Sequence, residues 1–72
     1  MEAPRLQDQE LTPHQMRLLK LFVEGYNYRL AAVELGVTVN TIAFHVKQIY
    51  NRLQVHSKAE AIAKAFREGI VS

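Results

Sequence analysis

Three side chains, spaced four and three residues apart, have the chemistry needed to contact the edges of DNA base pairs. Asn40 carries an amide that matches adenine N6 and N7, and the apolar ring of Phe44 suits a thymine methyl group. The ammonium of Lys47 can reach a guanine edge or a phosphate. Together they favour a binding site with A·T character at its centre. Further polar and basic residues are candidates for phosphate contacts, which position a protein without reading sequence: Arg29, Thr38, Thr41, Gln48, Asn51, Arg52 and Lys58.

Each base-reading candidate also has a simpler interpretation. Phe44 could fold onto a neighbouring helix as peripheral core, and Lys47 could be an ordinary surface lysine. Asn40, Gln48 and Asn51 could be solvated helix positions. The group as a whole is a stronger signal than any one member.

A helix over residues 39–53 would put these side chains on one side. Ile42, Val46, Ile49 and Leu53 recur at steps of four and three, which predicts a single buried stripe opposite Asn40 and the other polar positions. A shorter apolar helix should precede it over residues 28–35, with Ala32, Leu35 and Val37 marking the packing side. Between the two, Gly36 supplies a turn and Thr38 an N-cap. This pattern is typical of a helix-turn-helix.

Two further helices complete an all-α, four-helix prediction. Thr12, Pro13 and Gln15 form a capping box and a proline at the first helical position, so a helix should run from residue 13 to Gly25. Ser57 should cap a last helix that runs to about Glu68. The leader, residues 1–10, reads as a flexible tail or linker remnant, which leaves residues 11–72 as the domain.

The last helix has more apolar surface than one core contact needs. One subset of its residues should pack inward, and the other should meet a second copy of the chain. The residues assigned to this dimer contact are Ala59, Ile62, Ala63 and Phe66.

Length and composition limit the possible functions. A chain of 72 residues is too short for a sizeable enzyme pocket, and it has no cysteine for a disulfide or a thiolate metal site. No apolar run is long enough to cross a membrane, so we expect a soluble, cytoplasmic protein. The net charge is only +2, but residues 28–58 hold four basic residues against one acid, Glu34. The positive charge therefore lies on the predicted helix-turn-helix.

No catalytic or metal site is expected. His14, His45 and His56 do not have the spacing of metal ligands, and His45 should be a half-buried histidine that is hydrogen-bonded to backbone. The glycines are isolated, so there is no phosphate-binding loop, and no nucleophile is placed beside a base. We therefore predict neither enzyme activity nor a cofactor.

A longer pattern extends from Leu11 to the C-terminus in one register without a gap. Its residues are LTP at 11–13, EG at 24–25, Ala32, LGVT at 35–38, Thr41, Ile42, His45, Val46, Ile49, Arg52, Leu53, Val55, Ser57, Ala61 and Gly69. Over about five-sixths of its length the chain thus resembles the LuxR-type (GerE, NarL/FixJ-type) DNA-binding domain of bacterial transcription regulators.

The resemblance implies a four-helix domain whose third helix enters the major groove and whose fourth often forms a dimer contact. Double-stranded DNA is then the expected partner, with a homodimer and RNA polymerase as further expected partners. Two positions depart from the family: Ala43 replaces a common lysine, and Lys58 replaces the usual arginine. The chain could be a whole protein or the output domain of a longer response regulator.

Two other functions fit parts of the sequence. The promoter-reading domain that recognises the −35 element in sigma factors shares the LTP opening and a helix-turn-helix, but it does not require the alanine-rich fourth helix. A protein-interaction or dimerisation module that has lost DNA binding would explain Ala43 and the modest charge. Salt-dependent binding to random duplex DNA separates this second alternative from a DNA-binding domain.

Overall fold

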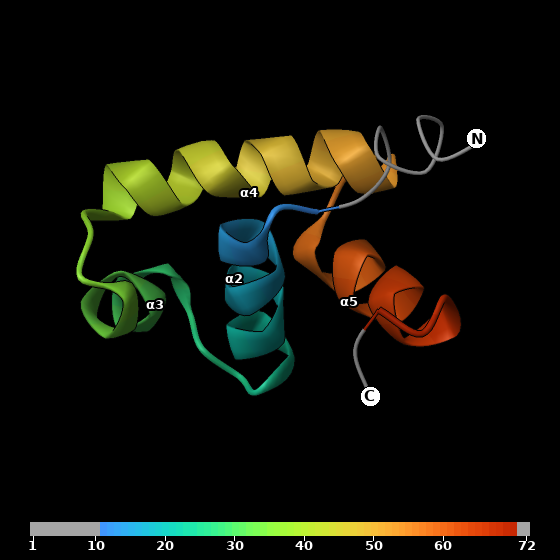
Figure 1. Ribbon diagram of the computed structural model, residues 1–72, viewed down its shortest axis with the longest axis horizontal. Helices are drawn as coiled ribbons and strands as arrows, with labels where there is room; N and C mark the ends of the chain where they lie inside the picture. Colours follow the sequence, from blue (N-terminus) through green and yellow to red (C-terminus); the bar gives the residue numbers. More distant parts are fainter. Residues whose placement is uncertain (1–10, 71–72) are drawn as a thin grey trace.

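The computed structural model describes residues 11–70 and contains four helices in that range, with no strand. They are α2 (Pro13–Val23), α3 (Tyr28–Leu35), α4 (Val39–Leu53) and α5 (Lys58–Arg67) (Figure 1). The all-α prediction is confirmed, and the predicted helices match to within about two residues. The tail predicted for residues 1–10 lies outside the described residues.

Each described helix begins at an N-cap residue, and three of the four, Thr12, Thr38 and Ser57, are the caps that the sequence predicts. The Thr12 hydroxyl accepts from the Gln15 backbone N–H at 3.2 Å, and the Gln15 side chain accepts from the Thr12 N–H at 3.0 Å, which is a complete capping box. The side chains of Asn27, Thr38 and Ser57 cap the other three helices, each accepting from the backbone N–H three residues further on. Local side-chain chemistry therefore sets where every helix begins.

The helices are arranged around α2. In Figure 1, α4 lies across the top, α2 stands beneath its middle, and α3 and α5 flank α2 on either side. Gly36, in the left-handed conformation with φ of 70°, ends α3 and turns the chain into α4. One core joins all four helices; its buried apolar members are Leu18, Leu19, Leu21, Phe22, Ala31, Ala32, Ile42, Val46, Ile49, Leu53, Ala61 and Ala65.

Three details differ from the prediction. Val37, expected on the packing side, is 39% exposed because the chain leaves the core at the Gly36 turn. Gln15, expected only to cap a helix, is buried with 2% of its surface exposed. The last helix ends at Arg67, with Glu68 as its C-cap. Within residues 11–70, no helix has the length and apolar character needed to cross a bilayer.

Candidate nucleic-acid interface

The side of α4 that faces away from the core carries the predicted base-reading residues. Ile42, Val46, Ile49 and Leu53 are buried, as the stripe predicts. Asn40 and Lys47 are exposed, and Phe44 is 57% exposed. An aromatic ring this exposed does not belong to the peripheral core, so that alternative for Phe44 is wrong.

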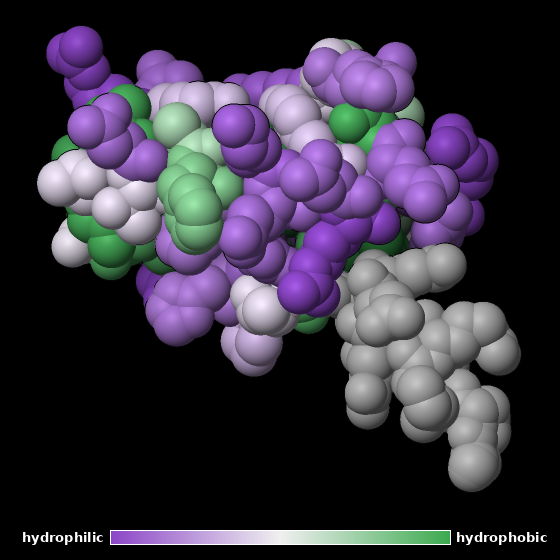
Figure 2. All heavy atoms as spheres, turned by 90° about the horizontal axis from the view of Figure 1, so that it is seen from above, coloured by the Kyte–Doolittle hydropathy of each residue, from purple (hydrophilic) through white to green (hydrophobic). Residues whose placement is uncertain are grey.

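The surface around these residues is polar and contains no acid from α4 itself. The sequence of this helix, VNTIAFHVKQIYNRL, has neither aspartate nor glutamate. Figure 2 looks down onto α4 and shows mainly hydrophilic residues over it, with a few apolar side chains among them. A helix face of this kind does not repel phosphates, which favours approach to DNA.

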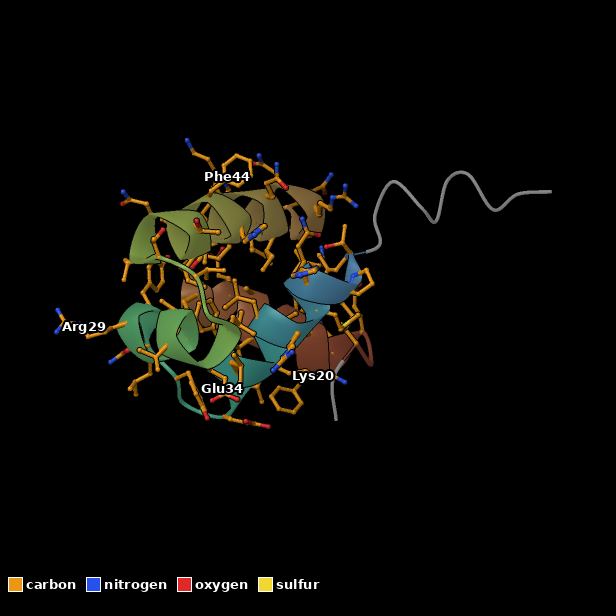
Figure 3. All side chains as sticks on the ribbon, turned by 60° about the vertical axis from the view of Figure 1, so that its left-hand side comes forward. Lys20, Arg29, Glu34 and Phe44 are labelled. Carbon is orange, nitrogen blue, oxygen red and sulfur yellow. The ribbon has the colours of Figure 1, made fainter. Side chains whose placement is uncertain are left out.

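The exposed charges lie on different sides of the domain. In Figure 3, Phe44 points away from the outer side of α4, whereas Lys20 and Glu34 lie on the opposite side of the molecule. Arg29 projects from the beginning of α3, at the edge between these two sides. The acid of the helix-turn-helix segment is thus turned away from Phe44.

At the beginning of α4, the two threonine hydroxyls bind each other. Thr38 Oγ1 lies 3.1 Å from Thr41 Oγ1 and also accepts from the Thr41 backbone N–H at 3.1 Å. The N-cap contact fixes both side chains at the N-terminus of α4, where backbone N–H groups without helical partners are directed outward. Asn51 is exposed further along the helix, and Arg52 is half-buried.

Gln48 is held from inside the domain. Gln15 Nε2 donates to Gln48 Oε1 at 3.2 Å, which joins α2 to α4. Because Gln15 also completes the Thr12 capping box, one buried amide links the beginning of α2 to the recognition-helix candidate. Sequence patterns alone do not indicate this contact, which spans 33 positions of the chain.

Lys58 does not occupy the position expected for a phosphate contact. Its ammonium donates to the Tyr26 carbonyl oxygen at 3.0 Å and lies 4.7 Å from the centre of the Phe22 ring. The side chain is half-buried and joins the beginning of α5 to the loop before α3. We therefore interpret Lys58 as a structural residue, because its ammonium is directed at protein rather than at solvent.

A second lysine of α5 makes a similar contact that the sequence analysis missed. Lys64 Nζ donates to the Leu53 carbonyl oxygen at 2.7 Å, at the end of α4, and lies 3.9 Å from Glu68. A cation at this position also interacts favourably with the negative end of the helix dipole. The two lysines connect α5 to the loop before α3 and to the end of α4.

His45 lies beside the buried stripe, but its predicted backbone hydrogen bond is absent. Its Nδ1 atom is buried and has no partner among the described residues, so that prediction was wrong. The ring stacks on His14 of α2, with centroids 6.5 Å apart, and meets the edge of Phe44 at 5.8 Å. No group of three or more histidine, cysteine or acidic residues within residues 11–70 could hold a metal ion.

Tyr50 lies on the inner side of α4 and is half-buried. Burial raises the pKa of Tyr50 to about 12, and the neighbouring Tyr28 contributes in the same direction. The phenol therefore stays neutral at physiological pH.

The outer side of α5 carries the residues assigned to a dimer contact. Ala61 and Ala65 are buried against the domain, which confirms that one subset of the helix packs inward. Phe66 is 50% exposed, Ala59 and Ala63 are exposed, and Ile62 is half-buried. An apolar strip of small and large residues thus remains open to solvent on this helix.

Comparisons with known proteins identify a family. Residues 9–65 match the GerE family, described as "Bacterial regulatory proteins, luxR family". The chain is similar to the HTH-type transcriptional regulator AlkS of Pseudomonas putida, with 36% identity over 85% of this chain and 7% of AlkS. It is also similar to the transcriptional regulatory protein YdfI of Bacillus subtilis, with 32% identity over 88% of this chain and 30% of YdfI.

The response regulator protein VraR of Staphylococcus aureus is 30% identical over 85% of this chain and 29% of its own length. The chain thus spans less than a third of the length of each of these relatives. Among solved structures, that of the transcription factor GerE has a TM-score of 0.80 and 24% identity, and the match covers 86% of this chain and 92% of GerE. This structural similarity establishes the fold.

Proposed function

The chain belongs to the LuxR family of bacterial regulatory proteins, and from this premise we propose that it binds double-stranded DNA sequence-specifically, with α4 in the major groove. The observation that carries the proposal is the exposed, acid-free side of α4, which presents Asn40, Phe44 and Lys47 away from the core. A major groove admits one helix, and this is the longest one of the described residues.

Three residues provide the base contacts in this proposal. The Asn40 amide pairs with adenine N6 and N7, and the Phe44 ring packs on a thymine methyl group. Lys47, about one turn beyond Ala43 and two turns beyond Asn40, reaches a guanine edge or a phosphate. With Ala43 in place of the family's common lysine, apolar contact dominates this part of the helix. The preferred half-site should therefore have A·T base pairs at its centre.

Backbone contacts would flank these three residues. Arg29 at the beginning of α3 and the Thr38–Thr41 pair at the beginning of α4 can reach one strand. Asn51 and Arg52 lie near the other end of α4 and can reach the second strand. Gln48 contributes mainly through its bond to Gln15, and Lys58 is left out because its ammonium contacts Tyr26. The two arginines, together with Lys47 if it reaches a phosphate, give a log–log salt slope on the order of −2 to −3 per monomer.

We further propose that two copies bind one operator through the outer side of α5. A single module with so few contacts binds weakly at physiological salt. A twofold pair places two recognition helices about one DNA turn apart, so the operator should be an imperfect inverted repeat with half-sites about 10 bp apart.

Substitutions of two lysines on opposite sides of the domain test the proposed function. Lys47→Ala should weaken specific binding by about 1–3 kcal/mol if Lys47 contacts a base, and a sequence-independent loss with a salt slope reduced by about 1 would indicate a phosphate contact. Lys20→Ala is the matched control, because Lys20 is exposed on α2 on the side opposite Phe44. Fluorescence anisotropy with duplexes selected from a random pool measures both effects.

Equal affinity of the Lys47→Ala variant, the Lys20→Ala variant and the original protein for every duplex would show that Lys47 is an ordinary surface lysine. Weak binding to random duplex DNA that does not change between low and moderate salt would contradict DNA binding and favour the protein-interaction module.

A further inference from the structure

A hollow lies outside the proposed DNA-binding side, where α2, α3 and α4 meet. It measures about 240 Å³, somewhat below the roughly 300–1,000 Å³ of typical small-molecule sites. Its apolar wall is formed by Leu18 of α2, Leu35 of α3 and Val37 in the following turn. Val37 is 39% exposed, so this wall is open to a ligand.

The polar residues that line the hollow are two histidines and one arginine. His14 and Arg17 from the first half of α2 and His45 from α4 line it, and no acidic residue does. Arg17 has no ion pair within residues 11–70, and the His14 ring is exposed apart from its stack on His45. Three side chains that donate hydrogen bonds or carry positive charge therefore share a small space without a counter-charge.

One of these groups is also unsatisfied. His45 Nδ1 is buried and lacks a hydrogen-bond partner among the described residues. A buried polar atom without a partner lowers stability, so a ligand that allows the ring to reorient and pair both nitrogens would be favoured. The His14 ring stacks on the His45 ring at an interplanar angle of 23°, and both rings line the hollow.

We propose that this hollow binds a small organic carboxylate. The carboxylate would accept hydrogen bonds from Arg17 and from the two imidazoles, since Arg presents a fork that matches two carboxylate oxygens. The apolar body of the acid would cover Leu18, Leu35 and Val37. An inorganic phosphate lacks such a body and leaves the apolar wall wet. Asn40, Phe44 and Lys47 do not line the hollow, although the His45 ring meets the edge of Phe44.

The first experiment compares two probes of the same shape. Sodium benzoate and neutral benzamide are titrated into the ¹⁵N-labelled chain at constant pH and ionic strength, in the presence of a chelator. Benzoate should produce saturable amide shifts centred on residues 13–18, 35–37 and 45, with a Kd on the order of 1 mM, and benzamide should bind at least about tenfold more weakly. Equal shifts with both probes would overturn the proposal, as would shifts produced equally by inorganic phosphate.

The second experiment uses matched variants. Arg17→Gln should weaken benzoate binding about tenfold because it removes a charge-assisted pair, and His14→Gln should weaken it less. Both residues are exposed, so the fold should persist in each variant. Arg67→Gln is the control, because Arg67 is exposed on α5 and does not line this hollow. Benzoate binding that is unchanged in Arg17→Gln, or reduced equally in Arg67→Gln, would contradict the site.

Discussion

At the scale of the residue, Lys47 and Lys58 show how one side-chain type takes two roles. Lys47 extends into solvent from the outer side of α4, whereas the Lys58 ammonium bonds the Tyr26 carbonyl and lies over the Phe22 ring. Both lysines lie in the basic segment of the sequence, and only the packing of α5 against α2 separates them.

This difference predicts that Lys58→Ala affects stability and not DNA binding, whereas Lys47→Ala affects DNA binding. Lys58→Ala should lower the free energy of unfolding by about 1–2 kcal/mol, since it leaves the Tyr26 carbonyl without this donor and uncovers Phe22. At temperatures where the domain stays folded, the salt slope of DNA binding should not change. Urea denaturation and anisotropy titrations measure the two quantities, and a reduced salt slope in Lys58→Ala would restore Lys58 as a phosphate contact.

Tyr50 gives a prediction in alkaline solution. Because burial raises its pKa to about 12 in the folded chain, above the ordinary value of 10.0, the folded state binds this proton more tightly than the unfolded state does. The corresponding stability is fully present below pH 10 and is lost as the pH rises through 12. Urea denaturation between pH 9 and about 12 should show a steeper decline for the original chain than for Tyr50→Phe, and parallel declines would contradict this assignment.

At the scale of the element, helix ends were the most predictable feature and long-range contacts the least. Thr12, Asn27, Thr38 and Ser57 each bond a backbone N–H three residues away, so their roles follow from the local sequence. The stripe of α4 was equally clear because its period matches the helix. The Gln15–Gln48 bond and the two α5 lysines join distant segments, and local patterns do not report which distant segments meet. The same reason explains why the hollow at His45 was missed.

The end of α4 offers a stabilising substitution. Gln54 has a left-handed conformation with φ of 58°, the only non-glycine residue with positive φ in residues 11–70. This conformation costs an L-residue about 1–2 kcal/mol, and glycine adopts it freely. Gln54→Gly should therefore raise the free energy of unfolding by about 0.5–1 kcal/mol, after the larger entropy loss of glycine is subtracted. Thermal denaturation measures the gain in stability. A lower midpoint in the variant would show that the Gln54 side chain stabilises the fold by more than its left-handed backbone conformation destabilises it.

At the scale of the whole molecule, α5 connects the proposed DNA-binding side to the proposed dimer contact. Lys58 and Lys64 fix α5 to the loop before α3 and to the last turn of α4. α5 packs on α2 and α4, and the Lys64 bond helps to hold its orientation relative to α4. In a twofold pair, this rigid connection would set the separation of the two recognition helices and hence the spacing of the half-sites.

The last prediction separates the dimer contact from DNA contact. Phe66 is 50% exposed on the outer side of α5, and Phe66→Glu would place a charge where two copies are proposed to meet. Affinity for an inverted repeat should fall at least about tenfold, because two linked half-sites no longer bind as one unit. Affinity for a single half-site should stay the same, and this duplex is the control for effects on folding and on the α4 surface. Ile62→Glu should likewise lower the affinity for the inverted repeat and leave the affinity for the half-site unchanged. Equal losses on both duplexes, measured by anisotropy, would show that α5 acts through the fold or through DNA and not through a second copy.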